Sequence, residues 1–246
     1  MSLERVFRYR SLDELATSMA GRLASRLAQL QASQDVVHLA LTGGATVQPV
    51  YAAFGNLAQA TSLDPARLEL WWSSERYVPT TDLQRNSTRA LTQLARTLPI
   101  VSSRVHPMPS STGTSDPDEA AFVYAEELGD VTFDICLLGI GTDGHVASIY
   151  PDHQSLRMQS DTTLSAIGVT DAPVEPPERV TLTLNAINRS SEVWLLAAGS
   201  DKADAIGRAL RHDQGTPAGL VHGAEATYWF LDRDAAAQLP YYRCRF

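Results

Sequence analysis

The residues best suited to chemistry lie in one glycine-rich segment near the middle of the chain, residues 138–148 (Leu-Gly-Ile-Gly-Thr-Asp-Gly-His-Val-Ala-Ser). This segment follows an apolar run, residues 133–138, that is typical of a buried strand. It places His145 in a stretch of flexible, glycine-containing backbone. Histidine is the side chain whose proton affinity best suits proton transfer near neutral pH. Open α/β sheets bind ligands at the carboxyl ends of their strands. We therefore expect a titrating histidine at a ligand-binding crevice.

A second glycine-rich turn, residues 42–46 (Thr-Gly-Gly-Ala-Thr), lies between a strand predicted at 36–41 and a predicted helix. Adjacent glycines such as Gly43 and Gly44 allow backbone N–H groups to converge on an anion at the start of a helix. The turn lacks the lysine and the spacing of a nucleotide P-loop. Two interpretations stay open: a phosphate cradle that includes Thr46, or a tight turn in which Thr46 caps the helix.

Three cationic side chains accompany other predicted strands. Arg76 and Lys202 each follow a strand, predicted at 68–73 and 193–198, and Arg179 directly precedes another. Each position taken alone is explained by an ordinary surface role, an ion pair for an arginine or solvation for the lysine. Because parallel strands end at the same edge of a sheet, the group as a whole predicts a phosphate-binding edge beside the histidine.

Gly139, Gly141 and Gly144 also match the spacing of the dinucleotide-binding fingerprint, and they follow a strand. The fingerprint normally belongs to the first βα turn of a fold, whereas this segment lies in mid-chain. Pro151 also arrives too soon for the long helix that a pyrophosphate would face. We therefore expect no nicotinamide or flavin site, and no cofactor.

The elements that must position these residues alternate between apolar runs of strand length and helical segments, which is typical of α/β proteins. Ser11 and Glu14 form a capping box for a first helix that extends through residue 30. We also expect a polar loop at 74–86 and a short strand at 104–106. The predicted fold is α/β: one mostly parallel sheet with helices on both faces, in a single domain spanning residues 1–246.

Composition limits the classes of function. The chain has 246 residues, 44% of them hydrophobic, and a formal net charge of −8 without any lysine- or arginine-rich run. This balance argues against nucleic acid as the main partner but not against a small phosphorylated ligand. No apolar run approaches the roughly 18 residues of a membrane span, and the N-terminus lacks the apolar stretch of a secretory signal. We expect no membrane association.

The chain has two cysteines, Cys136 and Cys244. Cys136 lies within an apolar strand pattern, which favours a buried thiol over a disulfide or a metal ligand. We therefore expect a reducing, cytoplasmic compartment and no metal site. The sequence leaves monomer and homodimer open.

With these residues in view, the segment Gly139-Ile-Gly-Thr-Asp-Gly-His-Val-Ala-Ser-Ile-Tyr-Pro151 resembles the signature of the 6-phosphogluconolactonases of the oxidative pentose phosphate pathway. Segments 41–46, 72–86, 176–183 and 199–202 match in the same order, so the resemblance spans nearly the whole chain. It implies a Rossmann-like fold shared with glucosamine-6-phosphate deaminases and ribose-phosphate isomerase-like proteins.

The resemblance also implies roles for individual residues. His145 would be the general base that activates water against the carbonyl of 6-phospho-D-glucono-1,5-lactone, without a metal, and Asp143 would orient the loop or the imidazole. The residues that hold the 6-phosphate would be Gly43, Gly44, Thr46, Arg76, Arg179 and Lys202. The partner would be a phosphorylated sugar lactone.

Two positions depart from the family pattern. Ser74 stands where the family usually has an aspartate, and Val174 stands where a lysine is frequent. Two alternatives therefore stay open. Aldose–ketose isomerases and deaminases of amino-sugar phosphates use a carboxylate at the position of Ser74 and an acid shortly after the histidine motif, and residues 146–151 contain no acid. A non-catalytic sugar-phosphate sensor is the second alternative.

Overall fold

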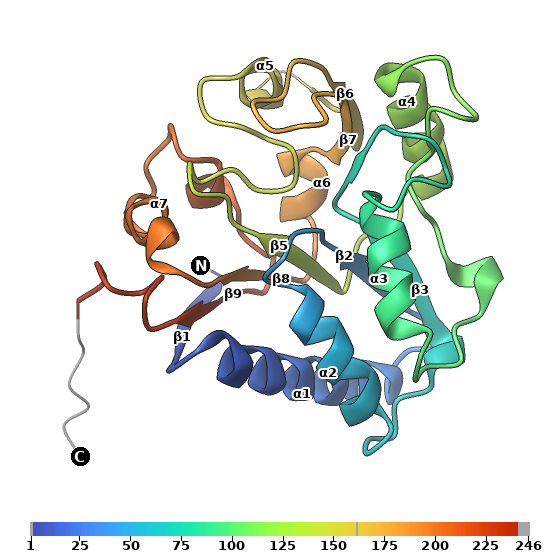
Figure 1. Cartoon of the computed structure of the whole chain (residues 1–246). Helices are drawn as coiled ribbons and strands as arrows, with labels where there is room; N and C mark the ends of the chain where they lie inside the picture. Colours follow the sequence, from blue (N-terminus) through green and yellow to red (C-terminus); the bar gives the residue numbers. More distant parts are fainter. Residues whose placement is uncertain (1, 161, 241–246) are drawn as a thin grey trace.

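Six parallel strands form the main sheet of the protein, in the order β1-β9-β8-β5-β2-β3 (Figure 1). The computed structural model describes residues 2–160 and 162–240. Along the sheet the strands are β1 Leu3–Tyr9, β9 Ala226–Asp232, β8 Glu192–Ala197, β5 Ile135–Gly139, β2 Val37–Leu41 and β3 Leu68–Trp72. This is the mostly parallel α/β sheet that the alternation of apolar runs predicts.

Helices cover this sheet on both sides. Figure 1 shows α1 (Leu12–Gln31) and α2 (Gln48–Ala58) below the sheet, and α6 (Leu184–Asn188) and α7 (Ala203–Ala209) above it. The predicted capping of α1 is confirmed, because the Ser11 hydroxyl accepts a hydrogen bond from the Glu14 N–H at 3.3 Å. The remaining helices are α3 Asn86–Leu94, α4 Pro117–Leu128 and the short α5 Gln154–Arg157.

A second, three-stranded antiparallel sheet lies above the main one, in the order β4-β7-β6. Its strands are β4 Ser74–Arg76, β7 Arg179–Leu182 and β6 Ala166–Val169. The chain passes between the sheets at Ser73, whose N–H donates to Leu41 and whose carbonyl accepts from Leu182. The expectation of a loop from residue 74 is therefore wrong at its start, because a three-residue strand is too short to leave a periodic pattern.

Other local expectations are also corrected. The strand predicted at 104–106 is absent, because Ser102–Arg104 form a 3-10 turn and Val105 makes only an isolated bridge to Leu70. Strand β1 escapes the sequence analysis because it is an edge strand, and most of its residues are exposed. α2 begins after Val47 without a side-chain cap, so Thr46 does not cap it.

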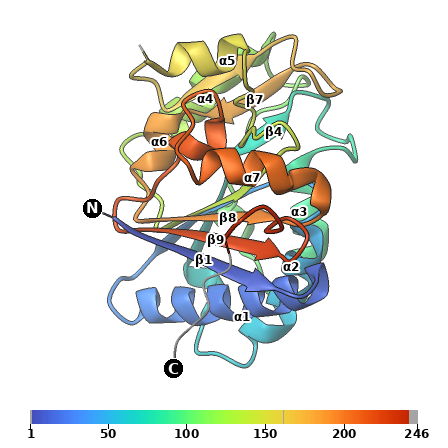
Figure 2. The same cartoon turned by 90° about the vertical axis from the view of Figure 1, so that its left-hand side faces the viewer.

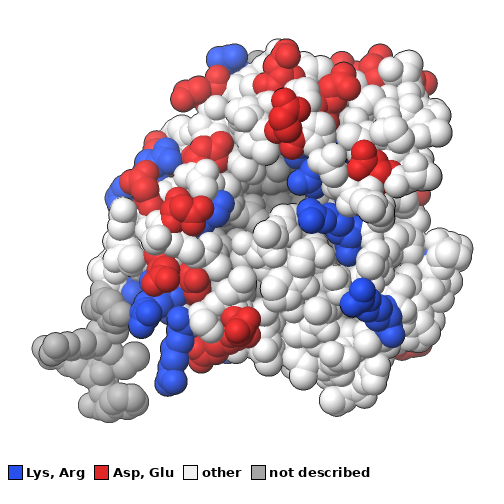
Figure 3. Space-filling model, in the orientation of Figure 1, with Lys and Arg blue, Asp and Glu red and all other residues white. Residues whose placement is uncertain are grey.

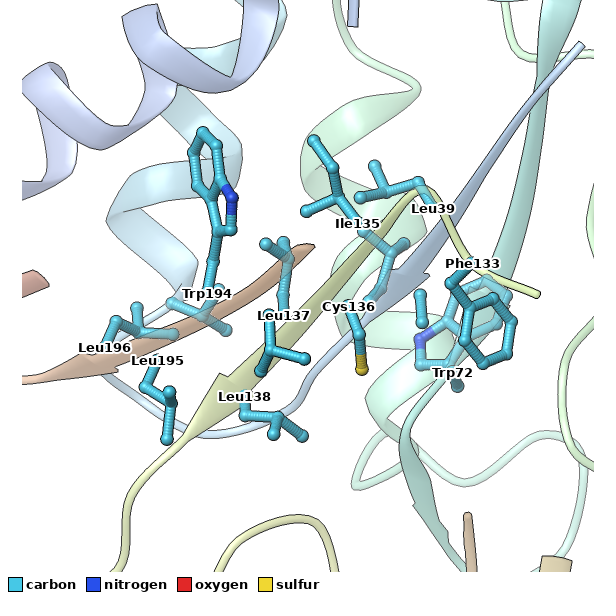
Figure 4. Close-up of a cluster of buried hydrophobic side chains, with 14 of the residues drawn as sticks. Leu39, Trp72, Phe133, Ile135, Cys136, Leu137, Leu138, Trp194, Leu195 and Leu196 are labelled. Atoms are coloured by element: carbon cyan, nitrogen blue, oxygen red, sulfur yellow. The ribbon is translucent and has the colours of Figure 1, made fainter. Parts of the chain in front are cut away.

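The core contains buried side chains of α1, α2, α4, α6 and α7 as well as those of the central strands. Figure 4 shows its central cluster, which contains Leu39, Trp72, Phe133, Ile135, Cys136, Leu137, Leu138, Trp194, Leu195 and Leu196. Cys136 is fully buried there, and burial raises the pKa of its thiol to about 12. Cys244 lies outside the described residues. Within 2–160 and 162–240, no helix is both long enough and apolar enough to cross a membrane.

Candidate active site

A tight loop after β5 holds His145. The Gly141 N–H donates to the His145 carbonyl at 2.9 Å, and the Gly144 N–H donates back to the Gly141 carbonyl at 3.1 Å. Gly144 adopts φ +94°, which favours glycine. A Cβ on Gly141 would lie 2.1 Å from His145 Nδ1, far inside van der Waals contact. These two glycines therefore allow the loop conformation and the close packing of the imidazole.

Asp143 fixes the orientation of the imidazole. One carboxylate oxygen, Oδ1, lies 2.7 Å from His145 Nδ1 and also accepts from the His145 backbone N–H at 3.0 Å. Burial by itself would raise the pKa of the Asp143 carboxyl, but the hydrogen bonds and charge of His145 outweigh it and lower the pKa below its usual value. An ionised Asp143 selects the tautomer with the proton on Nδ1, so Nε2 keeps its lone pair.

Two further contacts support this loop. Arg208 Nη2 donates to the Asp143 carbonyl at 3.1 Å, which ties the loop to α7. The ring of Tyr150 packs against the imidazole, with the two centroids 4.6 Å apart. Tyr150 is only 1% exposed, so it restricts the movement of the His145 ring.

The loop opens into a cavity of about 420 Å³ at the carboxyl ends of β2, β5 and β8. Figure 3 shows a hollow in this part of the surface with basic side chains on both sides. The predicted residues that line the cavity are Gly43, Gly44, Thr46, Arg76, His145, Arg179 and Lys202. Asp143 is not among the lining residues and contacts the cavity only through His145.

The glycine turn at 42–46 is held from two sides. The Thr42 N–H donates to the Tyr51 hydroxyl at 2.9 Å, and the same hydroxyl donates to the Thr42 carbonyl at 2.8 Å. The Thr42 side chain accepts from the Gly139 N–H at 3.2 Å, which joins the turn to β5. Gly44 adopts φ +101°. The turn is thereby fixed next to the histidine loop.

Two arginines meet across the small sheet, because Arg76 and Arg179 are register partners in the β4–β7 pair. Burial and the neighbouring charge of Arg179 lower the pKa of the Arg76 guanidinium. Arg179 is held by the carbonyls of Val174, Glu175 and Pro176 at 2.7–3.0 Å. Two adjacent cations on one wall favour a bound anion.

Asn86 and Glu75 position Arg76. Arg76 Nη1 donates to Asn86 Oδ1 at 2.5 Å, and Asn86 Nδ2 donates to the Ser74 carbonyl at 2.8 Å. The fully buried Glu75 carboxylate accepts from the N–H groups of Asn86 and Ser87 at the start of α3. Asn86 also packs against Gly43 so closely that a Cβ added to Gly43 would overlap the Asn86 side chain. This network connects the arginine to the glycine turn.

Lys202 completes the cationic side of the cavity from the turn after β8. Its Nζ lies 4.0 Å from Asp201, and its side chain is 18% exposed. The lining also includes Ser74 and Val174, the two departures from the family pattern. Within the described part of the chain, no group of three or more His, Cys, Asp or Glu side chains is arranged to hold a metal ion.

The sequence analysis missed Asn86, Tyr150 and Asp201, which also line the cavity. A signal existed for Tyr150, because it lies inside the histidine motif five residues after His145. Asn86 is the last residue of the matching segment 72–86, but its place at the cavity depends on where α3 starts relative to β4. The second sheet also brings Arg76 next to Arg179, a pair that no single sequence motif contains.

The chain is similar in sequence to known proteins. Residues 10–229 match the family described as glucosamine-6-phosphate isomerases/6-phosphogluconolactonase. A 6-phosphogluconolactonase of Streptomyces coelicolor is 39% identical over 94% of this chain and 93% of its own length. One from Mycobacterium tuberculosis is 38% identical over 93% of this chain and 95% of its own.

The chain is also similar to solved structures. The crystal structure of a 6-phosphogluconolactonase from Thermotoga maritima superposes with a TM-score of 0.81 at 28% identity, covering 93% of this chain and 99% of that one. A monomeric glucosamine-6-phosphate deaminase superposes with a TM-score of 0.78 at 20% identity, covering 95% and 99%. The second likeness shows a shared fold only.

Proposed function

Because this chain belongs to the glucosamine-6-phosphate isomerase/6-phosphogluconolactonase family, we propose that it hydrolyses 6-phospho-D-glucono-1,5-lactone to 6-phospho-D-gluconate. The observation that carries the proposal is the common cavity of the His145 imidazole and the cations Arg76, Arg179 and Lys202. The proposal includes the oxidative pentose phosphate pathway as the setting of the reaction and the cytoplasm as its compartment.

In the proposed reaction, His145 first accepts a proton and later returns it. Nε2 accepts a proton from water while the water oxygen attacks the lactone carbonyl carbon, which gives a tetrahedral intermediate. When the bond from that carbon to the ring oxygen breaks, the imidazolium returns its proton to the ring oxygen. Asp143, paired to Nδ1 at 2.7 Å, stabilises the positive imidazolium between the two steps.

The phosphate is proposed to bind at the opposite wall. Gly43, Gly44 and Thr46 would supply turn N–H groups and a hydroxyl, and the arginines and Lys202 would neutralise the dianion. A volume of about 420 Å³ falls within the ordinary range for small-molecule sites. Binding energy from this remote group would position the carbonyl against the water held by His145.

The isomerase or deaminase alternative is less favoured by the site. Those reactions move a carbon-bound proton and need a carboxylate where this cavity has Ser74. Residues 146–151, after the histidine, contain no acid either. A non-catalytic sugar-phosphate sensor shares the same pocket, and only measured turnover separates it from the lactonase.

The test is a direct assay of lactone consumption. The lactone is generated in situ and followed at slightly acidic pH, where spontaneous hydrolysis is slow. We expect rapid consumption by the wild type, collapse in His145→Ala, and wild-type activity in His222→Ala, a matched control at an exposed histidine. Binding of 6-phosphogluconate should survive in His145→Ala. A wild type no faster than buffer but able to bind 6-phosphogluconate would support the sensor instead.

A further inference from the structure

We infer that Lys202 is an acylation site, at which a small acyl phosphate transfers its acyl group to Nζ; this rests on the phosphate site of the proposed function. Lys202 is the single lysine among the 246 residues, and the other cationic side chains are arginines or histidines. An arginine guanidinium stays protonated and is a poor nucleophile, whereas the neutral amine of a lysine is a good one. The only side-chain amine of the chain lines the same cavity as His145.

The turn before α7 holds the backbone of Lys202 in place. Ser200–Lys202 form a 3-10 turn after β8, and Figure 2 shows α7 above β8 and β9, on the side of the sheet away from α1. Gly199 precedes the turn at φ +101°, and its N–H donates to both oxygens of the buried Asp232 carboxylate at 3.1 Å. The Lys202 N–H donates back to the Gly199 carbonyl at 3.2 Å. The amine is therefore carried by a fixed part of the backbone.

The amine itself lies at the cavity without a close partner. Among the described residues, Asp201 supplies the one carboxylate within ion-pair distance of Nζ, at 4.0 Å, which is longer than a hydrogen bond. The Asp201 side chain is 62% exposed, so solvent screens this contact. Once Nζ has lost a proton, its lone pair is available to an electrophile in the cavity.

The proposed phosphate site selects the kind of electrophile. Arg76, Arg179 and Lys202 line one cavity, with basic side chains on both sides of the hollow (Figure 3). In an acyl phosphate, a single oxygen joins the phosphorus to the acyl carbon, so a phosphate bound among these cations places the acyl carbon next to Nζ. In the lactone, the 6-phosphate and the carbonyl lie at opposite ends of the sugar. The same binding therefore holds the lactone carbonyl away from the amine.

The transfer balances without a further reactant. The neutral Nζ attacks the acyl carbon, the bond from that carbon to the bridging oxygen breaks, and inorganic phosphate leaves with the electron pair. The nitrogen then loses one proton to solvent, and an uncharged amide remains. Acylation removes one of the three cations at the site. KM for the phosphorylated lactone should therefore rise about 10- to 100-fold, as for loss of one charge-assisted hydrogen bond.

The test is acetylation of the full chain by acetyl phosphate at mildly alkaline pH, followed by peptide mapping with mass spectrometry. Arg233→Lys supplies a matched comparison in the same molecule, because Arg233 lies 3.7 Å from Asp234 and its side chain is 72% exposed. Acetyl phosphate should acetylate Lys202 at least about tenfold faster than the amine that this substitution introduces. The N-hydroxysuccinimide ester of acetic acid, which has no phosphate, should favour the exposed amine instead.

Two further measurements test whether the phosphate directs the reaction. Inorganic phosphate should protect Lys202 from acetyl phosphate, and Arg76→Ala should slow this acetylation at least about tenfold. Arg76→Ala should change the reaction with the succinimidyl ester much less, which separates a lost phosphate contact from a lost fold. An unmodified Lys202, equal rates at the two amines with acetyl phosphate, or acetylation insensitive to inorganic phosphate would overturn the inference.

The effect on function is measured on the acetylated protein. KM should rise in the wild type, whereas treatment should not change the kinetics of Lys202→Arg, which controls for acetylation of the N-terminal amine. An unchanged KM after complete acetylation of Lys202 would refute the expected effect on binding. If the protein hydrolyses no lactone, the same loss is measured as weaker binding of 6-phosphogluconate. Because acetylation is read by mass, its failure and a failure of lactone hydrolysis are distinguishable.

Discussion

Replacing Gly141 with alanine should remove catalysis while leaving the fold and the phosphate site nearly intact. The added Cβ would lie 2.1 Å from Nδ1 and 2.2 Å from Cε1 of His145, and 2.6 Å from Oδ1 of Asp143. The backbone of Gly141 is fixed by its hydrogen bonds within the loop, whereas the imidazole is a side chain that can rotate. We therefore expect the ring to turn away and to lose its bond to Asp143.

The magnitude follows from the role proposed for His145. General base catalysis contributes about 10²–10⁴-fold in rate, which corresponds to about 2.7–5.4 kcal/mol of transition-state stabilisation at 1.36 kcal/mol per tenfold. The kcat of Gly141→Ala should fall by about that factor and approach the kcat of His145→Ala. KM should change little, because the proposed phosphate ligands come from other turns.

The assay is steady-state hydrolysis of the phosphorylated lactone, with Gly139→Ala as the control. A Cβ on Gly139, two residues earlier in the same segment, would meet only the Gly43 carbonyl at an ordinary 3.4 Å. Urea unfolding of each variant separates loss of catalysis from loss of fold. A Gly141→Ala enzyme with near-wild-type kcat would refute the close approach of imidazole and backbone, and with it the proposed position of the base.

Three other outcomes are expected. Arg76→Ala should raise KM for the phosphorylated lactone about 10- to 100-fold, the effect of losing one charge-assisted hydrogen bond, and should leave turnover of unphosphorylated gluconolactone unchanged; equal effects on both substrates would contradict the phosphate site. Asp143→Asn should lower kcat more than it changes KM. Because its folded-state pKa is lowered, Asp143 stabilises the fold fully above its unfolded pKa of 3.8, and the contribution is lost as pH falls below 3.8 through the folded pKa. The stability difference between wild type and Asp143→Asn in urea titrations should thus shrink as pH falls below about 4. Burial that raises the pKa of Cys136 to about 12 should protect it from disulfide reagents at pH 8 until the protein is unfolded, which peptide mapping by mass spectrometry checks.

Local patterns in the sequence were sufficient for the helices and strands that have a periodic apolar face. The first helix, with its capping residues Ser11 and Glu14, and the buried strands of the main sheet were predicted within a residue or two at most boundaries. Strand β1 could not be predicted in this way, because an edge strand with exposed side chains has no buried face to mark it. Strand β4 is only three residues long and carries no detectable period.

The sequence by itself determined the chemistry available to this protein: a histidine in a glycine loop, a glycine turn after a strand, and cations beside other strands. Only the tertiary structure decided that these groups share one cavity. Arg76 and Arg179 are separated by more than a hundred residues in the chain, yet antiparallel pairing of β4 with β7 makes them neighbours. That pairing depends on backbone hydrogen bonds between two short strands, which residue type and spacing do not encode. The same holds for Asn86, which meets Arg76 because the buried Glu75 carboxylate fixes the start of α3 beside β4.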